Sequence, residues 1–227
     1  MKPSLTAILL PLAAALSALA GCVNADTVDG PVEMTVYNIV TFEGNDPTAR
    51  FTFQPQGDAT ALTLTAQQTV DTATAQAGMR VMLAYQTPDA ARPGAITLKG
   101  VSRITQGALT GSKGEPRGWD TDGVWVESVW RSGAYIDMRL RLPYTDVARR
   151  FALMVDSATI AGGHPQLYLY HSLPEGVSPD STYLKRYYAS FLISSLWSRP
   201  ETEDVTVNIA NTNLTSKRSF IFKKNQP

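Results

Sequence analysis

The sequence predicts an all-β protein in which an N-terminal OB-type barrel is followed by a C-terminal β-sandwich. Most apolar runs after residue 32 are short, rich in Val, Ile, Thr, Tyr and Phe, and bounded by Gly, Pro, Asn or Asp. Apolar and polar residues alternate in them with a period of two, as in half-buried strands. A polar, glycine-rich stretch at 106–118 separates an early group of strands from a later one, so we expect two β domains.

The clearest alternation runs from Tyr135 to Leu142. It predicts a strand with one buried face, formed by its apolar residues, and one solvated face, formed by Tyr, Asp and Arg. On this pattern the inward residues are Ile136, Met138, Leu140 and Leu142, and the outward ones are Tyr135, Asp137, Arg139 and Arg141. Elsewhere the inward residues are expected to be Leu62 and Leu64, Val81, Leu83 and Tyr85, Leu167 and Leu169, Val205, Val207 and Ile209, and Phe220 and Phe222.

Four segments are expected along the chain. Residues 1–22 are predicted to be a lipoprotein signal peptide, 23–32 a tether, 33–112 the OB-type barrel and 113–227 the sandwich. The apolar part of the leader, Leu5 through Leu19, is shorter than the roughly 20 residues of a membrane-spanning helix. About five or six strands precede the division, which suits a small closed barrel, and about six or seven follow it, which suits two sheets.

Cys22 is the predicted site of lipid attachment. Residues 19–22 read Leu-Ala-Gly-Cys and resemble the bacterial lipobox, whose small residues allow cleavage before a cysteine. The thiol accepts diacylglycerol, and two or three acyl chains hold a protein stably on a membrane. Because Val23 follows in place of aspartate, the outer membrane is favoured, with its periplasmic and surface faces both left open.

The charge balance argues against binding of nucleic acid, and the cysteine content argues against a disulfide. Twenty basic residues balance twenty acidic ones, so no overall field attracts a polyanion, and nucleic acid is not expected to bind. With Cys22 as the single cysteine, no intrachain disulfide is expected.

No catalytic or metal-binding pattern stands out. The two histidines, His164 and His171, are not spaced as a ligand pair, so neither a metal nor another cofactor is predicted. No Gly-x-Ser-x-Gly motif is present. The carboxylates Asp120 and Asp122, and those at 201–204, are more typical of solvated turns than of an acid and base pair. The sequence therefore predicts a protein without enzymatic activity.

Aromatic side chains are the candidate binding residues. Tyr168 and Tyr170 alternate with Leu167 and Leu169, which places them on the solvated face of their strand. Such rings stack on sugars or anchor protein partners, although aromatic residues also favour strands for packing alone. The candidates are Trp125, Trp130, Tyr135, Tyr168 and Tyr170.

The lipobox and three further segments together resemble the NigD-like lipoproteins of Bacteroidota. These segments are the strand at 78–85, the aromatic-flanked hairpin at 122–138 and the strand at 188–193. The resemblance covers most of the chain after Cys22. It implies an N-terminal OB-type domain followed by a β-sandwich, and it supplies no catalytic residues. An association of that family with a bacteriocin operon implies an immunity-like role as one option.

We therefore expect an envelope-anchored, non-enzymatic lipoprotein that binds a protein or glycan partner. An immunity-like lipoprotein is the alternative, and a carboxylate-dependent hydrolase is a weaker one. A concave aromatic surface would favour glycan binding, whereas two carboxyl groups converging in a deep cleft would favour the enzyme.

Overall fold

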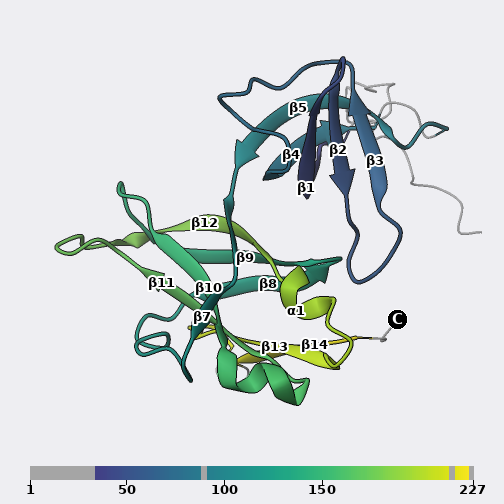
Figure 1. Ribbon diagram of the computed structural model, residues 1–227. Coiled ribbons are helices and arrows are strands. Elements are labelled where there is room, and N and C mark those ends of the chain that lie inside the picture. Colours follow the sequence, from purple (N-terminus) through teal and green to yellow (C-terminus); the bar gives the residue numbers. More distant parts are fainter. Residues whose placement is uncertain (1–33, 88–90, 215–217, 225–227) are drawn as a thin grey trace, which may run out of the picture. The chain divides into compact units, whose positions relative to one another are not determined.

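The computed structural model describes residues 34–87, 91–214 and 218–224. The predicted signal peptide, Cys22 and the tether lie outside the described residues. Within them the chain forms fourteen strands, one 3-10 helix, η1 (Ser157–Gly162), and one short α-helix, α1 (Ser194–Trp197). The prediction of an all-β protein is confirmed (Figure 1).

Five strands form a closed barrel with the order β1-β2-β3-β5-β4. Pairing is antiparallel except between β3 and β5, which run parallel. Alternate side chains fill the interior, among them Val40, Phe51 and Leu83. The barrel strands are β1 (Val36–Asn45), β2 (Ala49–Phe53), β3 (Leu62–Ala66), β4 (Arg80–Gln86) and β5 (Ala95–Arg103).

Leu62 corrects one predicted inward position. Its side chain is 49% exposed, whereas Leu64, with the same parity on β3, is buried. Leu62 is the first residue of its strand and pairs with Phe53, the last residue of β2. Leu62 therefore lies at the end of the β2–β3 pair, and its predicted inward position is wrong.

Nine strands form two further sheets that share one core. Their orders are β14-β13-β11-β10-β7 and β6-β12-β9-β8. The predicted inward residues of β9, from Ile136 to Leu142, are almost fully buried in this core, as are Leu167 and Leu169. The strands are β6 (Thr105–Ala108), β7 (Thr110–Ser112), β8 (Trp125–Ser132), β9 (Tyr135–Tyr144), β10 (Arg150–Asp156), β11 (Gln166–Ser172), β12 (Asp180–Leu192), β13 (Asp204–Asn208) and β14 (Ser219–Lys223).

The chain leaves the barrel earlier than the predicted boundary at residue 112. β6 pairs in parallel with β12, and β7 pairs in parallel with β10. Both short strands therefore belong to the second group of sheets, and the transition falls at Ile104, between β5 and β6. The glycine-rich composition of 106–118 concealed these strands because glycine is uncommon in strand interiors.

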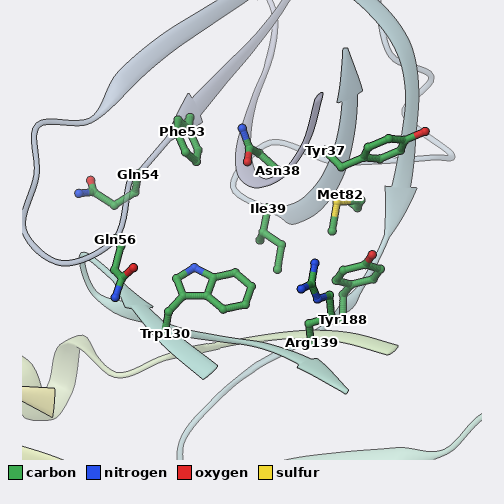
Figure 2. A pocket seen from close by; sticks show the side chains of 10 residues that line it. All are labelled: Tyr37, Asn38, Ile39, Phe53, Gln54, Gln56, Met82, Trp130, Arg139 and Tyr188. Atoms are coloured by element: carbon green, nitrogen blue, oxygen red, sulfur yellow. The ribbon is translucent and has the colours of Figure 1, made fainter. Parts of the chain in front are cut away.

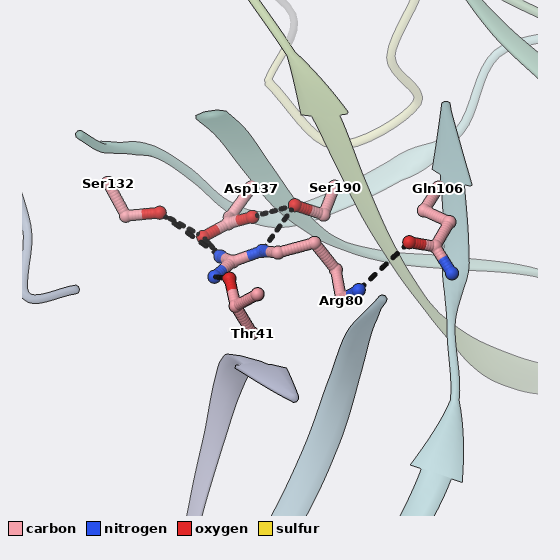
Figure 3. A network of polar contacts seen from close by, with 6 residues as sticks. All are labelled: Thr41, Arg80, Gln106, Ser132, Asp137 and Ser190. Carbon is pink, nitrogen blue, oxygen red and sulfur yellow. Dashed lines mark hydrogen bonds and ion pairs between the residues drawn. The ribbon is translucent and has the colours of Figure 1, made fainter. Parts of the chain in front are cut away.

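Asp137 corrects the prediction that the outward face of β9 is solvated. Its side chain is 1% exposed and pairs at 2.7 Å with Arg80 of β4, which is also buried (Figure 3). The hydroxyls of Ser132 and Ser190 donate to the carboxylate, and Arg80 Nε donates to Ser190 Oγ at 3.0 Å. The backbone N–H of Arg80 donates to Gln106 Oε1 at 2.9 Å. This network joins a barrel strand to strands β6, β8, β9 and β12.

A second buried arginine joins the β2–β3 connection to β8. Arg131 makes a bidentate pair with Asp58, with distances of 2.7 and 2.6 Å, and its guanidinium lies 4.2 Å from the ring centroid of Trp197. The N–H of Gly57 donates to the Arg131 carbonyl, and the N–H of Gly133 donates to the Gly57 carbonyl. Gly133 has a φ of +57°, which favours glycine at this hairpin turn.

Candidate ligand-binding site

The candidate site lies on the outward face of the sheet β6-β12-β9-β8. Strand register sets four rows of side chains across β8, β9 and β12 on this face. The two rows nearest Arg80 take part in the buried network or adjoin it, and the other two are more open. From the open end, the rows are Trp125, Arg141 and Arg186; Ser128, Arg139 and Tyr188; Trp130, Asp137 and Ser190; and Ser132, Tyr135 and Leu192.

A pocket of about 260 Å³ lies where barrel side chains meet this face, and we call it the rim pocket (Figure 2). Its volume is close to the lower end of the roughly 300–1,000 Å³ found for small-ligand sites. Figure 2 shows Trp130 and the neighbouring Arg139 and Tyr188 on the sheet, with Ile39 reaching between them from the barrel. The lining residues are Tyr37, Asn38, Ile39, Phe53, Gln54, Gln56, Met82, Trp130, Arg139 and Tyr188.

The lining combines aromatic rings with amide groups. Two of the amides are held in place, because Asn38 Nδ2 donates to the Tyr85 hydroxyl at 2.9 Å and Gln54 Nε2 donates to the Ala59 carbonyl. These contacts leave the side-chain oxygens of Asn38 and Gln54 available as acceptors. An apolar surface with a few fixed polar groups can bind a small ligand in one orientation.

Beside the rim pocket, four charged residues form what we call the Glu127 cluster: Glu127, Arg139, Arg141 and Arg186. The pairing of β8 with β9 shifts between Val126 and Ser128, so Glu127 is the extra residue of a β-bulge. Its carboxylate contacts all three arginines, with distances of 2.7 Å to Arg139 Nε and 2.9 Å to Arg186 Nε.

The Glu127 carboxylate is ionised under ordinary conditions. Burial raises its pKa, but the hydrogen bonds and positive charges of Arg186 and Arg141 together outweigh burial and hold the pKa below its ordinary value. A carboxylate with a 9% exposed side chain is therefore kept charged by Arg186 and Arg141.

The structure brings together three of the five predicted aromatic residues. Trp125, Trp130 and Tyr135 share the outward face of the β8–β9 hairpin. Trp130 lines the rim pocket and Trp125 is 45% exposed. Tyr135 lies 4.4 Å from the Arg80 guanidinium, so its ring covers the buried network.

Tyr168 and Tyr170 lie apart from these residues, on β11 of the other sheet. The ring of Tyr168 packs edge-on against buried Trp119, with a centroid distance of 5.1 Å. Burial raises the pKa of Tyr168, as do the carboxylates of Glu115 and Asp156. Both tyrosines are half-buried, not solvated, because the connection after β7 lies over them.

Sequence reasoning missed the barrel side of the rim pocket. Tyr37 and Met82 lie on strands that read as ordinary barrel strands, and nothing local marks their outward side chains as lining a site. The sequence did contain a signal for Arg139. Alternation places it on an outward position, as it does the other two arginines and Glu127, on strands whose pairing could be proposed. Only the pairing of β9 with β12 brings Arg186 to them.

The two histidines differ in environment. His164 is exposed and its Nδ1 lies 2.8 Å from Asp204 Oδ2. His171 is buried, its Nε2 donates to the Asp122 carbonyl at 2.9 Å, and burial lowers its pKa. Within the described residues no group of three or more His, Cys, Asp and Glu side chains could hold a metal ion. No helix in the described part of the chain has the length and apolar character needed to cross a membrane.

Comparison with known proteins identifies the fold. No family model matches the chain, and no curated protein matches it in sequence. Among solved structures, a DUF1344 protein of unknown function from Bacteroides vulgatus is 17% identical, with a TM-score of 0.60 over 86% of this chain and 92% of that one. A NigD-like immunity protein from Bacteroides caccae is 19% identical, with a TM-score of 0.56 over 85% and 93%.

A third solved structure, named as a candidate lipoprotein from Bacteroides fragilis, is 14% identical, with a TM-score of 0.55 over 84% of this chain and 97% of that one. The chain thus shares its fold with solved proteins of Bacteroides that include a NigD-like one. The resemblance expected from the sequence is confirmed at the level of fold.

Proposed function

We propose that this chain is an envelope-attached lipoprotein without enzymatic activity, whose folded part binds a glycan in the rim pocket. The glycan proposal rests on the lining of that pocket, in which Trp130, Tyr188 and Phe53 lie together with three amide side chains. Aromatic faces pack against the apolar faces of sugar rings, and amides exchange hydrogen bonds with hydroxyl groups. A volume of about 260 Å³ suits one sugar ring, with the rest of a glycan outside.

The envelope attachment rests on the lipobox ending at Cys22 and on the outer-membrane preference inferred from Val23. One protein of the same fold is itself named as a candidate lipoprotein. For the fold we propose the finer description of an OB-type barrel joined to a β-sandwich. The barrel order β1-β2-β3-β5-β4 and the single core shared by the other two sheets support this description.

Lipid attachment is tested by growing cells with an alkyne-bearing fatty acid and detecting label on the protein. The expected result is labelled wild-type protein in the membrane fraction and unlabelled Cys22→Ser protein, because only the thiol accepts diacylglycerol. Wild-type protein without label, or with a mature N-terminus other than Cys22, would overturn the attachment while leaving the binding proposal to be judged separately.

Glycan binding is tested by screening the full chain, in mild detergent, against an oligosaccharide array and measuring affinities for the hits by calorimetry. Trp130→Ala should weaken binding at least tenfold, since truncation of a buried aromatic contact is typically of this size or larger. Tyr183→Ala, which removes an exposed aromatic ring outside the rim pocket, is the matched control. If no oligosaccharide binds, or if both variants lose affinity equally, the rim pocket is not a glycan site.

An immunity-like role is the second candidate, favoured by the NigD-like immunity protein among the structures of the same fold. It is distinguished by expressing the chain in a bacteriocin-sensitive strain of Bacteroides and measuring survival. Protection that persists in Trp130→Ala would support immunity through another surface. A hydrolase is not proposed, because the lining of the rim pocket brings together no pair of carboxylates among the described residues.

A further inference from the structure

We infer that the glycan held in the rim pocket is acidic, and that the Glu127 cluster binds its carboxylate or sulfate groups. This inference rests on the proposed glycan function and specifies the class of glycan. It is carried by three features of the cluster: an excess of positive charge, guanidinium nitrogens left without protein partners, and continuity with the rim pocket.

The excess of charge is local. The whole chain has no net charge, yet in the cluster three arginines face one carboxylate, which leaves two positive charges uncompensated. The buried pair of Arg80 with Asp137 and that of Arg131 with Asp58 each match one arginine to one carboxylate. The cluster therefore differs from the structural ion pairs of the same chain.

The guanidinium groups are held in place while keeping donors for a ligand. Arg139 and Arg141 contact Glu127 through Nε, and among the described residues their terminal nitrogens have no other hydrogen-bond or ion-pair partner. Arg186 uses Nε and Nη2. The three side chains are 42 to 45% exposed. Terminal guanidinium nitrogens match the geometry of carboxylate and of tetrahedral oxyanions, and fixing them beforehand lowers the entropy lost on binding.

The cluster continues the rim pocket along the same sheet face. Arg139 belongs to both, since it lines the rim pocket and contacts Glu127. In the outermost row, exposed Trp125 pairs with Arg141. Along β9 this row and the row of Trp130 lie four positions apart, at Arg141 and Asp137, which is a distance of about 13 Å. A second aromatic platform therefore lies in the row of Arg141 and Arg186, and a chain of several sugar rings running from Trp130 to Trp125 would pass Arg139 and reach these two arginines.

A structural role for Glu127, tying β8 to β9 and β12, does not account for the excess of arginine. One arginine would satisfy the carboxylate, and ion pairs with partners this exposed contribute little to stability. An acidic ligand accounts for the remaining charge because its anionic groups would restore neutrality on the face.

The test compares oligogalacturonates with the same oligomers after chemical reduction of their carboxyl groups, together with sulfated oligosaccharides from chondroitin sulfate. Calorimetry with the full chain in mild detergent should show an acidic oligomer binding at least tenfold more tightly than the neutral one. The double variant Arg141→Gln with Arg186→Gln should lose that preference and keep the neutral affinity. Raising the salt concentration should weaken only acidic binding. Arg50→Gln with Arg150→Gln, two exposed arginines outside the cluster, is the matched control.

Equal binding of reduced and acidic oligomers, or an undiminished preference in the double variant, would overturn the inference and leave glycan binding intact. Binding of no oligosaccharide on the array would overturn both. Because glutamine keeps much of the length of arginine and the thermal midpoint of each variant is recorded, loss of the fold is separated from loss of recognition.

Discussion

Replacing Asp137 by alanine should lower the free energy of unfolding by about 3 to 5 kcal/mol, as expected when one partner of a buried ion pair is removed. Arg80 and Asp137 have side-chain exposures of 2% and 1%, so alanine would leave a guanidinium charge buried without its partner. Ser132 and Ser190 would also lose the acceptor of their hydroxyl groups. Denaturant unfolding followed by tryptophan fluorescence gives the measurement.

Two further variants separate charge from volume. Asp137→Asn keeps the size and should lose nearly as much stability as alanine, because the Arg80 charge stays unpaired. Arg80→Met with Asp137→Leu removes both charges and should recover part of the loss, since apolar pairs often replace buried ion pairs without penalty. If asparagine behaves as wild type, or if the double variant is as unstable as alanine, the ion pair does not hold these strands together.

The same network should also determine how cooperatively the protein unfolds. Arg80 lies on a barrel strand and Asp137 on β9 of the four-stranded sheet. In Asp137→Ala the barrel core and the core of the two sheets are expected to unfold in separate transitions, whereas wild type should unfold in one.

The strand pattern could be predicted because it depends on local alternation. The predicted inward positions of Ile136, Leu140 and Leu169 are confirmed, since a half-buried strand must alternate. Alternation does not tell what covers the other face. Asp137 was expected in solvent and is buried, because Arg80, 57 residues earlier in the chain, lies against it. Tyr168 was expected to be open and packs against Trp119.

The site could be predicted only on its sheet side. Trp125 and Trp130 follow from the alternation of a single hairpin, which the sequence encodes locally. The opposing residues, such as Tyr37 and Met82, depend on how the barrel core and the core of the two sheets meet, and no sequence periodicity indicates this. The Glu127 cluster could be predicted only in part. Its arginines on β9 follow from alternation, whereas the β-bulge that places Glu127 among them is seen only in the pairing of the strands.

Replacing Asp58 by alanine is expected to lower the free energy of unfolding by about 2 kcal/mol, close to the cost of removing a hydrogen-bonded partner from a charged group. Arg131 is buried and would keep only the Gly133 carbonyl and the Trp197 ring as partners. The Asp58 side chain is 59% exposed, so solvent compensates part of the loss and the effect stays below that of Asp137.

The local effect of Asp58→Ala distinguishes a role in positioning the pocket wall from a general role in stability. Asp58 holds the connection that carries Gln54 and Gln56 into the rim pocket, and the amides of Gly57 and Gly133 donate across the same contact. Hydrogen exchange in Asp58→Ala should therefore accelerate at residues 54–58 and 131–134 before other strands respond. Asp146→Ala, which removes an exposed carboxylate two residues after the end of β9, should change neither quantity. Uniform acceleration over the whole chain would mean that Asp58 stabilises the fold without positioning the wall of the pocket.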